Sequence, residues 1–315
     1  MKRRKGLGLM AMACAAVMAT AASAETFIGI LTGGQAGVYY PLGVALERIF
    51  AENLPESRPS TQSTKASVEN LNLLQAGRGE VAFTLGDSLR DAWNGNAESG
   101  FPQKLDNLRT IAAIYPNYIQ IVASEESGIK TLADLKGKRL SVGAPASGTE
   151  LNARAILNAA GITYEDLGKV EYLPFAESVD LMKNRQLDAT LQSAGLGVAS
   201  LRDLANSVPI TVVEVPRDVI EKIGSPYQVA TIPAGTYGGQ DADVTTAAVI
   251  NYLATRADLD DDTVYAMTKS IFENLDGLAA AHNAAKDIKL DKSATESPVP
   301  LHPGAERYFK EKGIL

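Results

Sequence analysis

The sequence predicts an α/β fold built from two lobes, each a mainly parallel sheet flanked by helices, with a ligand cleft between them. Short apolar runs alternate with segments of helical spacing, the alternation occurs twice, and one long apolar run at residues 110–124 separates the two occurrences. Strands that alternate with helices are typical of parallel sheets covered on both faces. Ligands of such sheets lie at the carboxyl ends of the strands, so the loops after the strands are the first candidates for a site.

The chain begins with a segment typical of a secretory signal. Lys2 to Lys5 are basic, an apolar stretch follows from Leu7, and the small residues before Glu25 predict cleavage after about Ala24. Without this segment 26 Lys and Arg stand against 37 Asp and Glu, and this acidic balance argues against nucleic acid or an anionic membrane as partners. Because Cys14 is the sole cysteine of the sequence and leaves with the signal, the exported chain has no disulfide and no thiolate.

The first lobe is expected to open with a buried strand, a glycine-rich loop and an amphipathic helix. The apolar run of residues 26–31 predicts the strand, and apolar residues at helical spacing from Val38 to Phe50 predict the helix. A second helix from Val68 ends at Gly77, and residues 81–86 follow it as another buried strand. The run of residues 110–124 is long and contains Pro116, so we expect it to cross between the lobes.

The second lobe repeats this order. Strands are expected at residues 139–142, 172–175, 189–193 and 210–215, and helices at residues 151–159 and 178–184. The rest of the chain is expected to be helical, at residues 244–255, 263–275, 279–286 and 305–312. The predicted division is 1–24 as signal peptide, 25–116 with 225–315 as the first lobe, and 117–224 as the second.

The loop GAPASGT, Gly143 to Thr149, carries the strongest site signal. It joins a predicted strand to a predicted helix, where free backbone N–H groups and hydroxyls form an anion site. Its glycine spacing is that of a phosphate-binding loop, but Thr149 stands where the lysine is needed, which favours an anion smaller than a nucleotide. Ser147 is also a good helix N-cap, and the two roles are compatible.

Further polar residues follow the other predicted strands, and each has a purely structural alternative. The glycines beside Thr32 serve either a tight turn or a ligand wall, Asp87 either meets a ligand amine or caps a helix, and Tyr115 either contacts a ligand or packs the hinge. For Thr64, Ser67 and Asn70 the alternative is a helix cap, and for Gln192 it is a polar side chain on the surface. The predicted ligand-binding set is Thr32, Gly33, Gly34, Tyr39, Thr64, Ser67, Asn70, Asp87, Tyr115, Ser147, Gly148, Thr149 and Gln192.

Signatures of enzymes and of metal sites are missing from the sequence. His282 and His302 are its only histidines and form no metalloprotease pair, and no nucleophile-elbow motif occurs. The acidic run at residues 258–262 lacks the glycine and the glutamate that a calcium loop requires. We therefore expect no catalytic residue, no metal and no cofactor.

Several long segments resemble the TAXI solute receptors, the periplasmic binding proteins of TRAP transporters. They are TGGQAGVYYPLG, TKASVENLNLLQAGRGEVAF, LADLKGKRLSVGAPASGTE, IPAGTYGGQDADV and PLHPGAERYFKEKG, and together they reach across nearly the whole mature chain. One departure lies in the second segment, where Lys65 and Ala66 occupy positions at which many relatives have glycine and serine. Lys65 either supplies positive charge to a second carboxylate or points into solvent.

The resemblance implies a type II periplasmic binding fold that closes on a small carboxylate, glutamate or a related C4–C5 dicarboxylate, and delivers it to a membrane permease driven by an ion gradient. It implies a periplasmic, monomeric protein and a cleft formed by Thr32, Gly34 and Tyr39, by Thr64, Ser67 and Asn70, and by Ser147 to Thr149. The alternative is a binding protein that serves a sensor or an ABC importer for an amino acid.

Overall fold

The computed structural model describes residues 26–294 and 297–315, so the predicted signal peptide lies outside the described residues. The strands are β1 Thr26–Leu31, β2 Ser57–Gln62, β3 Val81–Leu85, β4 Leu108–Ser124, β5 Arg139–Ser141, β6 Lys169–Glu171, β7 Ala189–Ala194, β8 Ile210–Val213, β9 Gln228–Ile232 and β10 Val244–Arg256. The α-helices are α1 Tyr39–Asn53, α2 Ser67–Gln75, α3 Gly86–Asn94, α4 Gly148–Ala159, α5 Phe175–Lys183, α6 Ala199–Ser207, α7 Arg217–Ile223, α8 Asp261–Glu273, α9 Leu275–Ala281 and α10 Pro303–Glu311.

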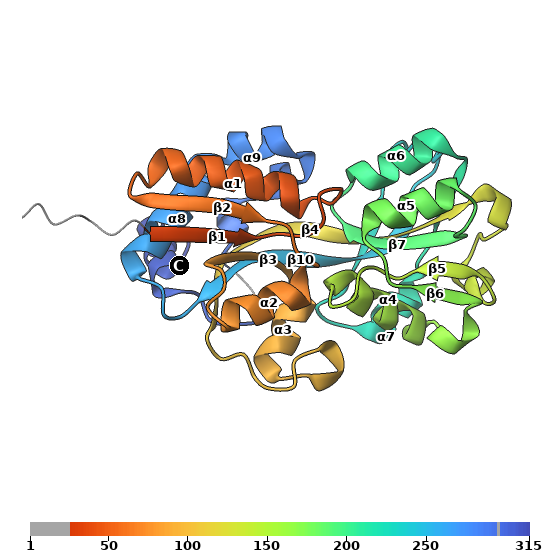
Figure 1. Cartoon of the computed structure of the whole chain (residues 1–315), viewed down its shortest axis with the longest axis horizontal. Coiled ribbons are helices and arrows are strands. Elements are labelled where there is room, and N and C mark those ends of the chain that lie inside the picture. The colour runs from red at the N-terminus through yellow and green to blue at the C-terminus, as the bar shows by residue number, and fades with distance from the viewer. Residues whose placement is uncertain (1–25, 295–296) are drawn as a thin grey trace, which may run out of the picture.

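The described strands form one mixed sheet in the order β2-β1-β3-β10-β4-β7-β5-β6, with β8 paired to β4 and β9 to β10. Pairing is parallel among β1, β2 and β3 and among β5, β6 and β7, whereas every pairing of β4 and β10 is antiparallel. Figure 1 shows two halves with helices on both faces of the sheet in each. We call β1–β3 with α1–α3 and α8–α10 the first half, and β5–β9 with α4–α7 the second half.

The long strands β4 and β10 run from one half into the other (Figure 1). Residues 108–113 of β4 pair with residues 252–256 of β10, which also pairs with β3, while residues 118–123 of β4 pair with β7. The prediction that the run of residues 110–124 crosses between the lobes is therefore confirmed. The expected α/β class is confirmed as well, with a sheet that is parallel at both ends and antiparallel in the middle.

The amphipathic helix predicted after the first strand is present as α1. Leu42, Leu46, Ile49 and Phe50 fall at the spacing of one helix face, and each is at most 2% exposed. They pack into a hydrophobic cluster with Ile28 and Ile30 of β1. Because this packing fixes where α1 begins, it also fixes the loop between Leu31 and Tyr39.

Two predictions of secondary structure are wrong. Residues 244–255, expected as a helix, form most of β10, which is buried between β3, β4 and β9; a strand buried on both faces has the same continuous apolar character as a buried helix. Residues 172–175, expected as a strand, follow β6, which ends at Glu171, and Phe175 already begins α5 behind the N-cap Pro174. Strands β2 and β9 and helices α6 and α7 were not predicted. The helix expected at residues 279–286 is interrupted at His282, where α9 has ended and a 3-10 turn over Asn283–Asp287 follows.

The predicted division of the chain at residues 116 and 225 stays a prediction. The hydrophobic cluster of the second half includes Ala247 of β10 and has Val229 of β9 packed against it. Val229 and the first residues of β10 therefore pack against the second half.

Candidate functional site

A cavity of about 600 Å³ lies between the two halves. Its lining comes from the loops that follow β1, β2, β5 and β6, from the ends of β3 and β7, and from the middle of β4. The lining residues are Gly33–Tyr39, Ser63–Ser67, Leu85, Asn117, Ala144, Ser147–Thr149, Pro174–Ala176, Ser193 and Ala194. The cavity therefore lies at the carboxyl ends of strands, where α/β sheets bind their ligands.

The first half contributes the wall formed by the loops after β1 and β2. Of the predicted residues, Gly33, Gly34, Tyr39, Thr64 and Ser67 line the cavity. The ring of Tyr39 stacks on Phe83 with 5.1 Å between the ring centroids, and burial raises the pKa of its hydroxyl, so Tyr39 stays protonated at physiological pH.

Thr32 and Asn70 hold these loops in place and do not line the cavity. Both are fully buried. The Thr32 hydroxyl donates to the Gln62 carbonyl at 2.7 Å, and the Asn70 amide donates to the carbonyls of Thr32 at 2.7 Å and Phe83 at 2.8 Å. Thr32 and Asn70 therefore stabilise the loops that form the cavity wall of the first half.

The second half contributes the N-terminus of α4. Ser147 is its N-cap and accepts a hydrogen bond from the Glu150 backbone N–H at 3.2 Å. The backbone N–H groups of Gly148 and Thr149 precede the first N–H that the cap satisfies, so helix geometry leaves them for a ligand. Ser147, Gly148 and Thr149 all line the cavity, so the structure brings the two predicted loops to one cavity from opposite sides.

Among residues 26–294 and 297–315, Lys65 is the one charged residue in the cavity lining. Within the described part of the chain no aspartate or glutamate lines the cavity, whereas the hydroxyls of Thr149 and Ser193 and the α4 N-terminus supply neutral donors. The Ser63 and Thr64 hydroxyls also line it but already donate within the first half. A cavity with one cation, several donors and no carboxylate favours an anionic ligand.

Tyr115 and Gln192, also predicted to contact a ligand, do not line the cavity. Tyr115 is fully buried in a hydrophobic cluster that includes residues of both halves. Gln192 is fully buried too, and its side-chain oxygen accepts a hydrogen bond from the Ser200 hydroxyl at 2.6 Å.

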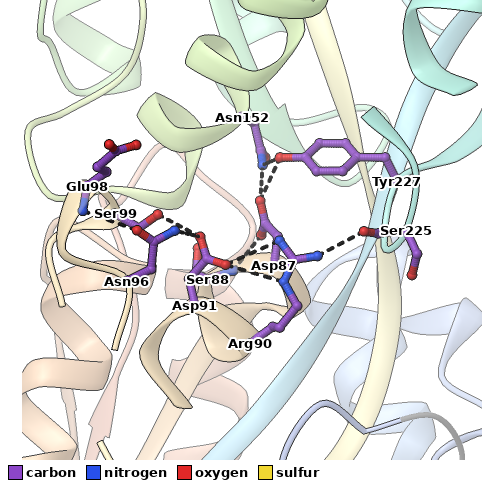
Figure 2. A network of polar contacts seen from close by, with 10 residues as sticks. All are labelled: Asp87, Ser88, Arg90, Asp91, Asn96, Glu98, Ser99, Asn152, Ser225 and Tyr227. Atoms are coloured by element: carbon purple, nitrogen blue, oxygen red, sulfur yellow. Dashed lines mark hydrogen bonds and ion pairs between the residues drawn. The ribbon is translucent and has the colours of Figure 1, made fainter. Parts of the chain in front are cut away.

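Asp87 joins the two halves through a buried network (Figure 2). It lies in the first turn of α3 and its Oδ2 atom accepts hydrogen bonds from the Asn152 amide of α4 at 2.6 Å and from the Tyr227 hydroxyl at 2.7 Å. Its other oxygen accepts from the Ser88 backbone N–H at 2.8 Å. Burial raises the pKa of Asp87, and burial beside Asp87 raises the pKa of Tyr227. Asp87 thus connects helices of both halves outside the cavity lining.

Other contacts between the halves surround this network. Arg90 of α3 donates to the Ser225 carbonyl at 2.8 Å (Figure 2), and Arg154 of α4 donates to the Glu98 carbonyl at 2.7 Å. The Glu69 backbone N–H donates to the Ala146 carbonyl at 3.1 Å. The two walls therefore touch at the edge of the cavity, and we call this arrangement closed.

Sequence reasoning did not select Asn117, Ser193 or Phe175, which also line the cavity. Asn117 directly follows Pro116 in the crossing strand, and Ser193 directly follows the predicted Gln192, so a signal existed in the polar residues that interrupt apolar strands. No such signal marked Phe175, because the helix that begins with it was predicted to start three residues later, at Ser178.

No group of three or more His, Cys, Asp or Glu side chains with metal-binding geometry occurs among residues 26–294 and 297–315. Over the same residues no helix is both long enough and apolar enough to cross a bilayer.

A model of the NMT1-like family matches residues 30–313. Among solved structures, the chain is similar to PhnD1 from Prochlorococcus marinus (MIT 9301) in complex with methylphosphonate, with TM-score 0.57, 13% identity and coverage of 92% of this chain and 96% of that chain. It is similar to a protein from Bordetella bronchiseptica RB50, with TM-score 0.54, 18% identity and coverage of 92% and 81%. It is also similar to a candidate L-cystine ABC transporter from Listeria monocytogenes, with TM-score 0.52, 15% identity and coverage of 84% and 98%. At these identities the likeness shows a shared fold.

Proposed function

The chain belongs to the NMT1-like family, and on this premise we propose that it is a periplasmic solute-binding protein, not an enzyme, that holds a small carboxylate between its two halves and passes it to a membrane importer. The single observation that carries this proposal is the cavity between the halves, lined by one cation, several hydroxyls and a helix N-terminus. The fold shared with a protein solved in complex with methylphosphonate supports a small anionic solute. A periplasmic location agrees with the segment at residues 1–24, which is typical of a secretory signal.

In the proposed mode of binding, the solute carboxylate docks on the backbone N–H groups of Gly148 and Thr149 and on the Thr149 hydroxyl. Residues of the first wall, from Gly33 to Tyr39, contact the solute from the other side, and Lys65 is the cation available to a second carboxylate. Closure excludes water, which strengthens each of these hydrogen bonds. The finer identity, glutamate or a related C4–C5 dicarboxylate, rests on the sequence resemblance.

The importer that receives the solute is the second part of the proposal, and the comparisons favour an ATP-driven one. One structure of the same fold is described as a candidate ABC transporter for L-cystine, whereas the TRAP permease is implied by the sequence resemblance alone. We therefore place the ABC importer ahead of the TRAP permease. Uptake into proteoliposomes that hold the importer decides between them, because an ABC importer requires ATP inside the vesicle, whereas a TRAP permease requires an ion gradient across its membrane.

A thermal-shift panel tests the class of solute. We expect L-glutamate, L-aspartate, succinate or 2-oxoglutarate to raise the unfolding midpoint of residues 25–315, because a ligand that binds only the folded chain stabilises it by about 2.7 kcal/mol at a hundred times its Kd. L-arginine is the matched cation and is expected to have no effect. Stabilisation by L-arginine and by none of the acids would contradict an anionic solute.

Thr149→Val is expected to weaken binding of the stabilising acid without unfolding the chain. The substitution keeps the shape of the side chain but removes its hydroxyl, which costs about 1–3 kcal/mol if a buried acceptor of the solute loses its donor. Calorimetry should show a Kd increased about five- to hundredfold. Thr231→Val on β9, outside the cavity, is the control, and an unchanged Kd for Thr149→Val would rule out this placement of the carboxylate.

A further inference from the structure

The crossing strands contain an irregularity behind the cavity, and Asn251 lies opposite it. Ile250 of β10 pairs with Pro116 of β4 and Tyr252 pairs with Ala113, so two residues of β4 face Asn251 alone. Such a bulge interrupts the ladder of hydrogen bonds and re-aims the side chains around it. Asn251 is fully buried, and its amide nitrogen lies 2.9 Å from the carbonyl oxygen of Tyr115, one of the two facing residues.

This carbonyl fixes the orientation of the Asn251 amide. A carbonyl oxygen only accepts, so the amide nitrogen must point to it, and the same nitrogen donates to Asn117 Oδ1 at 2.9 Å. Asn251 Oδ1 then faces the Tyr39 hydroxyl, 2.5 Å away, and Tyr39 must donate to it. The direction of each hydrogen bond follows from the one before it.

The chain of hydrogen bonds continues into the second half. The Asn117 amide nitrogen donates to the Ser193 carbonyl at 2.9 Å, which fixes the orientation of Asn117 in the same way. Tyr39, Asn117 and Ser193 line the cavity, from the first half, the crossing strand and the second half respectively, and each is at most 8% exposed. Asn251 does not line the cavity, yet it holds residues that do.

We propose that Asn251 is a positioning residue for solute binding, which ties the cavity-facing side chains Tyr39 and Asn117 to the bulge where the strands pass between the halves. The inference rests on the proposed solute-binding function. A change in the angle between the halves must pass through β4 and β10, since both strands extend across the two halves. Because Asn251 hydrogen-bonds Tyr39 and Asn117, a solute that contacts these two side chains stabilises one arrangement of the crossing strands.

A double-mutant cycle tests this role. The glutamate and succinate Kd values of the wild type, Tyr39→Phe, Asn251→Leu and the double variant are measured by calorimetry. We expect each single substitution to weaken binding at least fivefold, and the double variant to bind no more weakly than Asn251→Leu, because both remove the same hydrogen bond. Fold losses that multiply in the double variant would overturn the proposal, since independent structural damage has that signature.

Thr255→Val is the matched control on the same strand. Thr255 is fully buried and its hydroxyl donates to the Glu80 carbonyl at 2.7 Å, remote from the cavity. We expect a lower unfolding midpoint and unchanged Kd values for this variant, whereas equal weakening by Thr255→Val and Asn251→Leu would overturn a positioning role. If Asn251→Leu does not fold, Asn251→Ala replaces it in the cycle, because alanine removes the amide without placing a branched side chain in its space.

Failure of the inference is distinguishable from failure of the proposed function. If the wild type binds glutamate or succinate and the losses of affinity multiply in the double variant, only the role of Asn251 is contradicted. A wild type that binds none of the acids in the thermal-shift panel contradicts the proposed function, and the role of Asn251 with it.

Discussion

Gly148→Ala is expected to lower solute affinity about ten- to hundredfold while the solute-free chain stays as stable as before or becomes more stable. A Cβ atom at Gly148 would lie 2.6 Å from Leu85 Cδ1 and 2.7 Å from Ser67 Oγ, both in the first half. Overpacking of this kind costs about 1–3 kcal/mol, and here the cost falls on the closed arrangement. Alanine at the first position of α4 also favours the helix over glycine.

The opposite signs of the two effects make this substitution informative. Calorimetry gives the Kd, and small-angle scattering with and without succinate or glutamate reports whether the halves still close. Gly238→Ala is the control, because a Cβ there meets its nearest neighbour at an ordinary 3.6 Å and lies outside the cavity. A Gly148→Ala variant that binds as tightly as the wild type would mean that the halves need not approach as closely as in this structure.

Asp87→Ala is expected to weaken solute binding at least tenfold, by destabilising the closed arrangement. The substitution removes the buried acceptor of the Tyr227 hydroxyl and of one Asn152 N–H, while the Asn152 amide keeps its hydrogen bond to the Tyr227 oxygen at 2.9 Å (Figure 2). Each unsatisfied buried donor costs about 1–3 kcal/mol, and that cost disappears when the halves separate and water reaches both groups. Faster solute dissociation in stopped-flow measurements is the expected kinetic signature.

Asp91→Ala provides a control on the same helix. The carboxylate of Asp91 accepts from the Ser99 hydroxyl at 2.6 Å, from Asn96 at 3.3 Å and from Arg90 Nε and Nη2 at 3.3 and 3.2 Å, all within the first half (Figure 2). The Arg90 atom that donates to Ser225 is Nη1, which does not contact Asp91. We expect Asp91→Ala to lower the unfolding midpoint and to leave the dissociation rate unchanged. Equal effects of the two aspartate substitutions on dissociation would show that Asp87 acts on the stability of α3 and not on closure.

The two walls of the cavity were predictable because their signals are local. A strand followed by GAPASGT and a helix specifies an exposed helix N-terminus, and Ser147, Gly148 and Thr149 line the cavity as that pattern indicates. The glycine loop after β1 follows the same logic. In both loops neighbouring residues determine which backbone groups stay free.

The other candidates depended on partners that local patterns do not contain. Asp87 was weighed as a ligand contact or a helix cap, but its partners lie 65 and 140 residues away in the sequence, in the other half. Asn117 and Asn251 were not selected, since each occupies an apolar strand and gains its role from the bulge between β4 and β10. A polar residue in such a strand reveals its function only when its hydrogen-bond partners are known.

The sequence by itself determined the alternation of strands and helices, the crossing of the chain between two halves, and the loops that form the cavity walls, because hydrophobic spacing and turn residues act over a few positions. Only the tertiary structure decided that residues 244–255 form a strand, that Asp87 joins the halves and that Asn251 stands behind Tyr39. These features arise from contacts between distant segments, where burial and hydrogen-bond satisfaction override local preference.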